Sequence, residues 1–206
     1  MTRVTINKLI INILLLLLLL ISINSDKYIK ISSPVKGINV NNIDILYKGN
    51  YKDSITKFII KHEGLSLTSY RCEAGYNTIG YGHVIYDTLN HTITLNQADS
   101  LLNSDILKAQ KCFECNLSPE IQKSLKPWEK WVLIHFIYCK GIGNFNKSKI
   151  PLLLSTGENI DNELLKWTKH TKNDNLIHSD YSYRIRLVEL RLYNTGKLLI
   201  YKNFKQ

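Results

Sequence analysis

The chain has 206 residues, which is enough for one packed domain with appendages and too short for two domains of ordinary size. Its net charge of +10 favours anionic partners such as cell-wall polymers and lipid headgroups. We do not expect a nucleic-acid partner, because Lys dominates the basic residues and only five are Arg. A Lys-, Asn- and Ile-rich composition can also reflect nucleotide bias in a genome, so charge alone identifies no function.

The first 25 residues have the pattern of an export signal. Arg3 and Lys8 precede an apolar run at 9–23, which ends in polar Asn24. The run has about 15 residues, fewer than the ~20 that span a bilayer, so we expect a cleaved signal and a mature net charge of +8, two below the full chain. Ile23 stands where a small residue is preferred before cleavage. A form tethered to the membrane through residues 9–23 is therefore the alternative, and either form would act in the periplasm or outside the cell.

Residues 26–49 are polar and irregular and predict a linker, so we expect the folded domain to occupy residues 50–206. Apolar residues recur at helical spacing from Ile55, and the pattern ends at Glu63, before Gly64. Glu63 is thus predicted at a helix C-terminus, where the helix dipole disfavours a negative charge. This position favours the protonated form of its carboxyl group.

The next segment, residues 69–83, is rich in aromatic residues and glycine and predicts a β-hairpin followed by a glycine-bent strand. After Thr94 the sequence predicts only helices. Thr94 and Gln97 form a capping-box pattern, and further helices are expected at about 128–139, 160–170 and 181–195. A small sheet followed by a helical bundle indicates an α+β fold.

Four cysteines could form two disulfides in an exported protein, in any of three pairings. One pairing, Cys72 with Cys139, would block the thiol at position 72 until it was reduced.

Cys112 and Cys115 form a Cys-x-x-Cys pair, but no second pair or His follows at the spacing of a zinc site. We therefore expect neither a metal nor a redox role for that pair.

The segment from His62 to His83 resembles the catalytic signature of the phage-type lysozymes, the endolysins of glycoside hydrolase family 24. In that signature Glu is followed after eight residues by Asp or Cys and after five more by Thr, and here these positions hold Glu63, Cys72 and Thr78. The resemblance extends more weakly over residues 52–197. It implies a lysozyme-like α+β fold, with a small hairpin lobe and a helical lobe.

The resemblance also implies roles for these residues. Glu63 would protonate the leaving oxygen of a glycosidic bond, and Cys72 with Thr78 would manage the incoming water. Because a thiol accepts hydrogen bonds poorly, Cys72 must either orient water as a partly ionised thiolate or attack the sugar directly. The sequence leaves this choice open, and it also leaves open lytic transglycosylase chemistry, in which one Glu suffices.

Further residues are candidates for contact with the substrate. Tyr70 and Tyr81 could stack on sugars, although aromatic residues in a small sheet are more often core. His83 would brace the fold or line the cleft, and Arg186 would either pair with Glu63 or be solvated. Cys139 precedes the Gly141 turn, where relatives often have Asn or Gln.

We therefore expect a monomeric enzyme that hydrolyses the β-1,4 bond between N-acetylmuramic acid and N-acetylglucosamine in bacterial peptidoglycan, without metal or cofactor. This step from site to linkage rests on the resemblance. The competing hypothesis is a wall-binding protein that kept the cleft and lost the activity when Cys replaced Asp.

Overall fold

The computed structural model describes residues 43–45, 50–72, 75–172 and 175–201. All of them belong to one compact unit, Asn41–Gln206. The predicted export segment lies outside the described residues, as does most of the predicted linker at 26–49. Within that linker, β1 (Ile43–Ile45) forms an antiparallel pair with β7 (Leu199–Tyr201), a strand that the local sequence pattern did not predict. Among the described helices, none is long and apolar enough to cross a membrane.

Helix α2 (Tyr51–Glu63) confirms the first predicted helix and its end. The Asn50 side chain caps it by accepting a hydrogen bond from the Lys52 amide at 3.0 Å. Its apolar stripe is buried, and the chain turns away at Gly64, whose φ of 74° is a conformation that glycine adopts without strain. The helix therefore ends with Glu63 at its last position.

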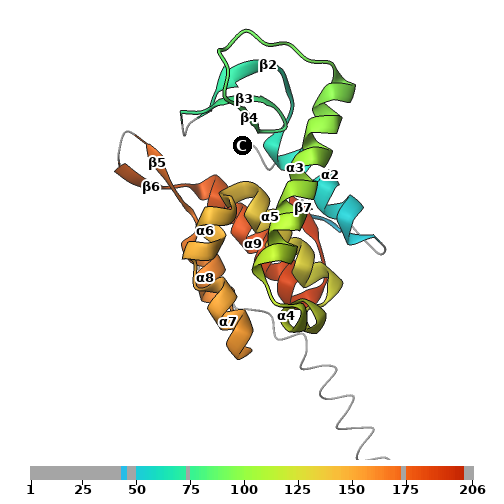
Figure 1. Ribbon diagram of the computed structural model, residues 1–206, viewed down its shortest axis with the longest axis vertical. Coiled ribbons are helices and arrows are strands. Elements are labelled where there is room, and N and C mark those ends of the chain that lie inside the picture. The colour runs from blue at the N-terminus through green and yellow to red at the C-terminus, as the bar shows by residue number, and fades with distance from the viewer. Residues whose placement is uncertain (1–42, 46–49, 73–74, 173–174, 202–206) are drawn as a thin grey trace, which may run out of the picture. The chain divides into compact units, whose positions relative to one another are not determined.

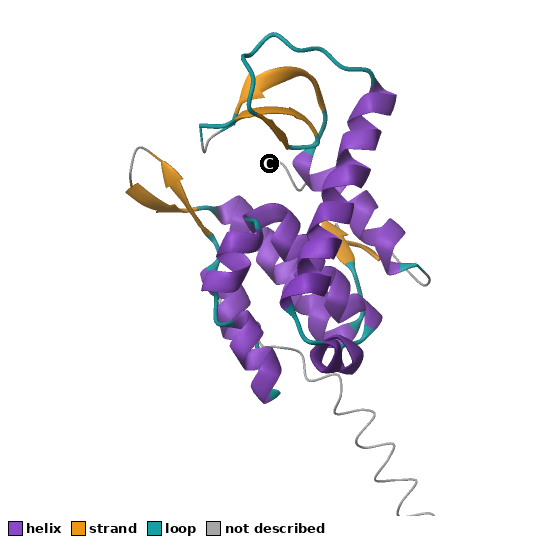
Figure 2. Ribbon diagram, in the orientation of Figure 1, coloured by secondary structure: helices purple, strands orange, loops and turns teal. Residues whose placement is uncertain are grey.

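The predicted hairpin and glycine-bent strand form a three-stranded antiparallel sheet in the order β2-β3-β4 (Figures 1 and 2). The strands are β2 (Ser66–Arg71), β3 (Asn77–Gly80) and β4 (His83–Ile85). Thr78 lies in the central strand, opposite Tyr70 on one side and Val84 on the other.

Helix α3 (Leu95–Asn116) connects the sheet to the helical part of the domain and packs against both β3 and α5 (Pro127–Lys140) (Figure 1). It begins with the predicted capping box, in which Thr94 and Gln97 each bond to the other's backbone. A Cβ at Gly80 would lie 3.6 Å from the Cβ of Ala98, so the strand and the helix approach closely.

Helix α5 lies at the centre of the helical part, in contact with α2, α3, α6 and α9. Six consecutive residues, Val132 to Ile137, are buried, as expected for a helix that is covered on every side. The other helices of the described residues are α4 (Pro119–Ser124), α6 (Ile142–Lys147), α7 (Ile150–Thr156), α8 (Asp161–Lys166) and α9 (Asp180–Thr195).

The prediction that only helices follow Thr94 was wrong for two segments, the strand β7 and the stretch at 169–178. The helix expected at 160–170 ends at Lys166, and the chain continues into the antiparallel pair of β5 (Lys169–Lys172) and β6 (Asn175–His178). A four-residue strand is too short for its alternation to be distinguished from a helical pattern in the sequence.

A buried network of charged and polar groups joins α9 to α5. Nη1 of Arg186 lies 2.8 Å from Oε2 of Glu189, and Oε1 of Glu189 lies 2.5 Å from Nδ1 of His135. All three side chains are at most 1% exposed. The Arg186 guanidinium also lies 5.0 Å from the centre of the Phe136 ring. The network ties the position of α5 to that of α9.

Replacing Glu189 tests this network. Glu189→Gln leaves the buried Arg186 charge without its counter-ion, which should lower the free energy of unfolding by roughly 3–5 kcal/mol in chemical denaturation. The matched control is Glu158→Gln, because Glu158 is exposed at the surface. A loss within about 1 kcal/mol of the control's would contradict a structural role for this pair.

Candidate active site

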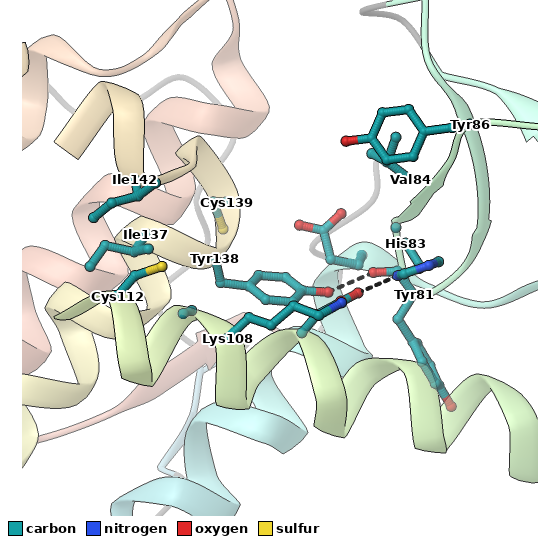
Figure 3. Close-up of a pocket in the computed structure, with 14 residues that line it drawn as sticks. Tyr81, His83, Val84, Tyr86, Lys108, Cys112, Ile137, Tyr138, Cys139 and Ile142 are labelled. Carbon is teal, nitrogen blue, oxygen red and sulfur yellow. Dashed lines mark hydrogen bonds and ion pairs between the residues drawn. The ribbon is translucent and has the colours of Figure 1, made fainter. Parts of the chain in front are cut away.

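A cleft of about 430 Å³ lies between the sheet and the helical part. Its walls come from the end of α2, the turn between β3 and β4, one face of α3 and the C-terminal half of α5. Figure 3 shows the cleft with its lining side chains, among them Tyr81, His83, Lys108, Tyr138 and Cys139. Four elements that are distant in the sequence thus meet around one space.

Glu63 lines this cleft, and its side chain is 27% exposed. Oε1 of Glu63 lies 3.2 Å from Nε2 of the buried His62. On the opposite side, a Cβ placed on Gly82 would lie 3.7 Å from Oε2, so the backbone between β3 and β4 lies close to the carboxyl group. Glu63 is therefore enclosed by protein but remains accessible to a ligand.

Two tyrosines hold the backbone around Glu63. The Tyr181 hydroxyl donates to the carbonyl oxygen of His62 at 2.8 Å, and the Tyr138 hydroxyl donates to the carbonyl oxygen of Tyr81 at 2.8 Å. Burial, and then the negative charge of Glu63, raise the pKa of both tyrosines far above the usual value. Both hydroxyls thus keep their protons at neutral pH and remain donors.

The sheet carries the other two residues of the signature. Thr78 is 3% exposed, and its hydroxyl donates to the carbonyl oxygen of Tyr76 at 3.1 Å. Cys72 follows β2, is partly buried, and bonds through its amide to the same carbonyl at 2.9 Å. Burial, then Glu63 and then Cys72, raise the pKa of the Tyr70 hydroxyl. Tyr70 is therefore close enough to both groups to sense their charges.

The remaining sheet candidates divide between the cleft and the core. His83 lines the cleft, and its Nδ1 lies 2.6 Å from Oδ2 of Asp105 on α3, as expected of a residue that braces the fold. Tyr81 contributes to the wall, but it is only 6% exposed and its hydroxyl donates to Asp99 at 3.2 Å. This placement favours the core role for Tyr81 over stacking on a sugar.

Arg186 differs from both alternatives that we derived from the sequence. It is buried rather than solvated, and its ion-pair partner is the buried Glu189 rather than Glu63. The side chain is 1% exposed and does not line the cleft. It packs instead against the Phe136 ring of α5. An Arg and a Glu three residues apart on one helix are neighbours, and that spacing could have indicated the pair.

Cys139 lines the cleft, and it belongs to a cluster of side chains that no local sequence pattern predicted. Its Sγ lies 3.5 Å from Nε2 of His135, one helical turn earlier on α5. Across from them, the His62 ring centre lies 5.2 Å from that of His135. The His-x-x-x-Cys spacing on α5 was the available signal, but only the fold reveals that His62 is adjacent.

Burial shifts the pKa of two residues of this cluster, His135 and Cys139. Burial lowers the pKa of His135, and the hydrogen bond that its Nδ1 donates to Glu189 opposes that effect without reversing it. Burial, and then the nearby Glu63, raise the pKa of the Cys139 thiol. A neutral imidazole that donates from Nδ1 to Glu189 presents its Nε2 lone pair to this thiol. All four cysteines of the chain are present as thiols, so neither the Cys72–Cys139 bridge nor another pairing is formed in this structure.

Comparisons with known proteins place this arrangement in a family. An endolysin from Acyrthosiphon pisum secondary endosymbiont phage 1 is 29% identical over 117 residues, which cover 56% of this chain and 77% of the relative. The endolysin from Escherichia coli O157:H7 phage FAHEc1 superimposes with a TM-score of 0.60 at 23% identity, over 76% of this chain and 96% of its own.

A second solved structure has the same fold. The muramidase domain of SpmX from Asticaccaulis excentricus superimposes with a TM-score of 0.59 at 22% identity, over 68% of this chain and 94% of the domain. The sequence model of the phage lysozymes matches residues 60–178, more than half of the chain, including the cleft residues from Glu63 to Ile142. The chain belongs to the phage lysozyme family.

Proposed function

We propose that this chain is a muramidase that hydrolyses the bond between N-acetylmuramic acid and N-acetylglucosamine in bacterial peptidoglycan. Membership of the phage lysozyme family supports this proposal. The observation that carries it is the position of Glu63, which lies at a helix end in the cleft and precedes Cys72 and Thr78 at the spacing of the family signature.

In this proposal Glu63 is the general acid. Its carboxyl group donates a proton to the glycosidic oxygen as the bond from that oxygen to the anomeric carbon breaks. The C-terminal end of α2 and the partial burial of the side chain both disfavour the charged form, which helps the group to hold its proton near neutral pH.

We assign the activation of water to Cys72 and Thr78. Water would add to the anomeric carbon, and its proton would pass to the thiolate of Cys72, with the Thr78 hydroxyl fixing its orientation. The closeness of Tyr70 to both Glu63 and Cys72 supports a shared site between the helix end and the hairpin. Direct attack by sulfur on the sugar is the alternative role for Cys72.

The location of the enzyme is also a proposal. Residues 1–25 would direct export, and the net charge of +8 on the remainder would favour contact with the anionic wall. The linker at 26–49 would separate the export segment from the catalytic unit, although β1 at its end pairs with β7 and so belongs to the folded part.

The first test removes the acid. Glu63→Gln keeps the shape of the side chain and removes its proton, so the rate of peptidoglycan clearing by purified residues 26–206 should fall about 10²-fold or more. The matched control, Glu114→Gln on the exposed surface of α3, should clear at the rate of the unmodified protein. Mass spectrometry of the products should show reducing ends.

Other outcomes of this test contradict the proposal in distinct ways. Products with 1,6-anhydro ends would identify a lytic transglycosylase. If the unmodified protein and Glu63→Gln are both inert yet sediment equally with peptidoglycan, the chain is a wall-binding protein.

A second test separates the two roles of Cys72. If the thiolate activates water, Cys72→Asp should retain clearing activity, because a carboxylate is the better acceptor, whereas Cys72→Ala should lose about 10²-fold. Cys115→Ala, at an exposed thiol, is the control. A glycosyl adduct on Cys72, trapped by acid quench and seen by mass spectrometry, would instead establish sulfur as the nucleophile.

A further inference from the structure

We propose that His62, His135 and Cys139 form a binding site for a divalent transition metal of the zinc class, with Glu63 as its fourth ligand. The three residues place one donor atom each within 4.8 Å of one another. Two imidazole nitrogens and one sulfur are a donor set typical of zinc, which also accepts a carboxylate oxygen. The ligation of Glu63 matters for activity only if the proposed function is correct.

The distances between donors suit tetrahedral coordination. Zinc binds nitrogen at about 2.0–2.1 Å and sulfur at about 2.3 Å, so neighbouring donors should lie roughly 3.3–3.6 Å apart. Sγ of Cys139 lies 3.5 Å from Nε2 of His135, and Nε2 of His62 lies 3.2 Å from Oε1 of Glu63. Two edges of the tetrahedron are thus close to their final length. The other edges among the three donors are at most 4.8 Å long and require closure of up to about 1.5 Å, and the partly exposed carboxyl group of Glu63 must rotate toward the ion.

The outer contacts orient both imidazoles toward the same point. Nδ1 of His62 lies 2.7 Å from the carbonyl oxygen of Phe58, and Nδ1 of His135 lies 2.5 Å from Glu189. In each case Nδ1 keeps its proton and donates it in a hydrogen bond to the acceptor, which leaves the Nε2 lone pair directed inward. Carbonyl and carboxylate partners of this kind fix the tautomer of histidines that bind metals.

The fold brings these donors together from two helices that pack against each other. His135 and Cys139 are four residues apart on α5, so they share a face, and His62 comes from the last turn of α2. Cys139 lines the cleft, as Figure 3 shows, so a metal ion can enter from the solvent side.

The charges balance when the metal binds. Cys139 releases its proton to solvent and becomes a thiolate, and both imidazoles bind in the neutral form. The +2 ion, the thiolate and the Glu63 carboxylate then sum to zero, which suits a site that protein encloses on most sides. Arg186 and Glu189 already compensate each other behind it.

Metal binding would remove the catalytic acid. A carboxylate bound to zinc cannot carry the proton that the glycosidic oxygen needs, so the loaded enzyme should be inactive and a chelator should restore it. The enzyme would therefore stay inactive wherever enough zinc is available to occupy the site.

Cobalt tests the site without reference to activity. The purified protein, titrated with Co²⁺ alone, should develop the near-ultraviolet charge-transfer band of a cobalt–thiolate bond, and Zn²⁺ should abolish the band by displacement. Cys139→Ser should lose the band and bind Zn²⁺ about tenfold or more weakly in calorimetry. Cys115→Ser, at an exposed thiol on α3, should behave as the unmodified protein.

A second variant separates loss of the metal site from loss of the fold. His62→Gln should also weaken Zn²⁺ binding, and melting curves followed by circular dichroism show which variants are folded. Absence of the cobalt band in the unmodified protein, or its persistence in folded Cys139→Ser, would overturn the site.

Measuring peptidoglycan clearing in the presence of Zn²⁺ separates the metal-site proposal from the proposed muramidase function. Zn²⁺ should inhibit clearing by the unmodified protein, and a chelator should reverse the inhibition. A cobalt band without zinc inhibition would overturn the ligation of Glu63 while leaving the three-residue site. A band in a protein that never cleaves peptidoglycan would overturn the proposed function alone.

Discussion

The site depends on how α5 is held at the centre of the domain. Because the middle of α5, Val132 to Ile137, is buried, His135 needs a partner inside the protein, and α9 provides it through Glu189, which Arg186 neutralises. With α5 fixed in this way, the Tyr138 hydroxyl reaches the carbonyl of Tyr81 and ties the sheet to the helices. These contacts between α9, α5 and the turn after β3 therefore set the width of the cleft.

The end of α2 is fixed from two sides. Gly64 ends the helix directly after Glu63, and Tyr181 on α9 bonds to the last turn through the His62 carbonyl. The carboxyl group then lies between a buried imidazole and the backbone at Gly82. In the proposed mechanism this enclosure favours the protonated acid, because solvent is partly excluded and a helix C-terminus disfavours a negative charge.

Local patterns predicted those parts of the fold and the site that are local in sequence. The stripe ending at Glu63, the capping box at Thr94 and the hairpin of β2 and β3 each lie within about twenty residues, so the sequence contains the signal. The pairing of β1 with β7 joins opposite ends of the domain and has no local signature. The spacing of Arg186 and Glu189 is local, but the sequence does not show that other elements bury this position, so neither expectation for Arg186 was right.

The same distinction explains why the histidine–cysteine cluster emerged only from the structure. His62 and His135 are separated by more than seventy residues, and each has an ordinary interpretation as a buried polar residue of a helix. Together with Cys139 they place nitrogen and sulfur donors beside the Glu63 carboxyl group, which is the acid in the proposed mechanism. The site gathers nitrogen, sulfur and oxygen lone pairs in a small volume, and a metal ion would compete with protons for them. An acid built in this way is open to control by metal, and the thiol at position 139 is the donor that gives such control its preference for zinc over magnesium or calcium.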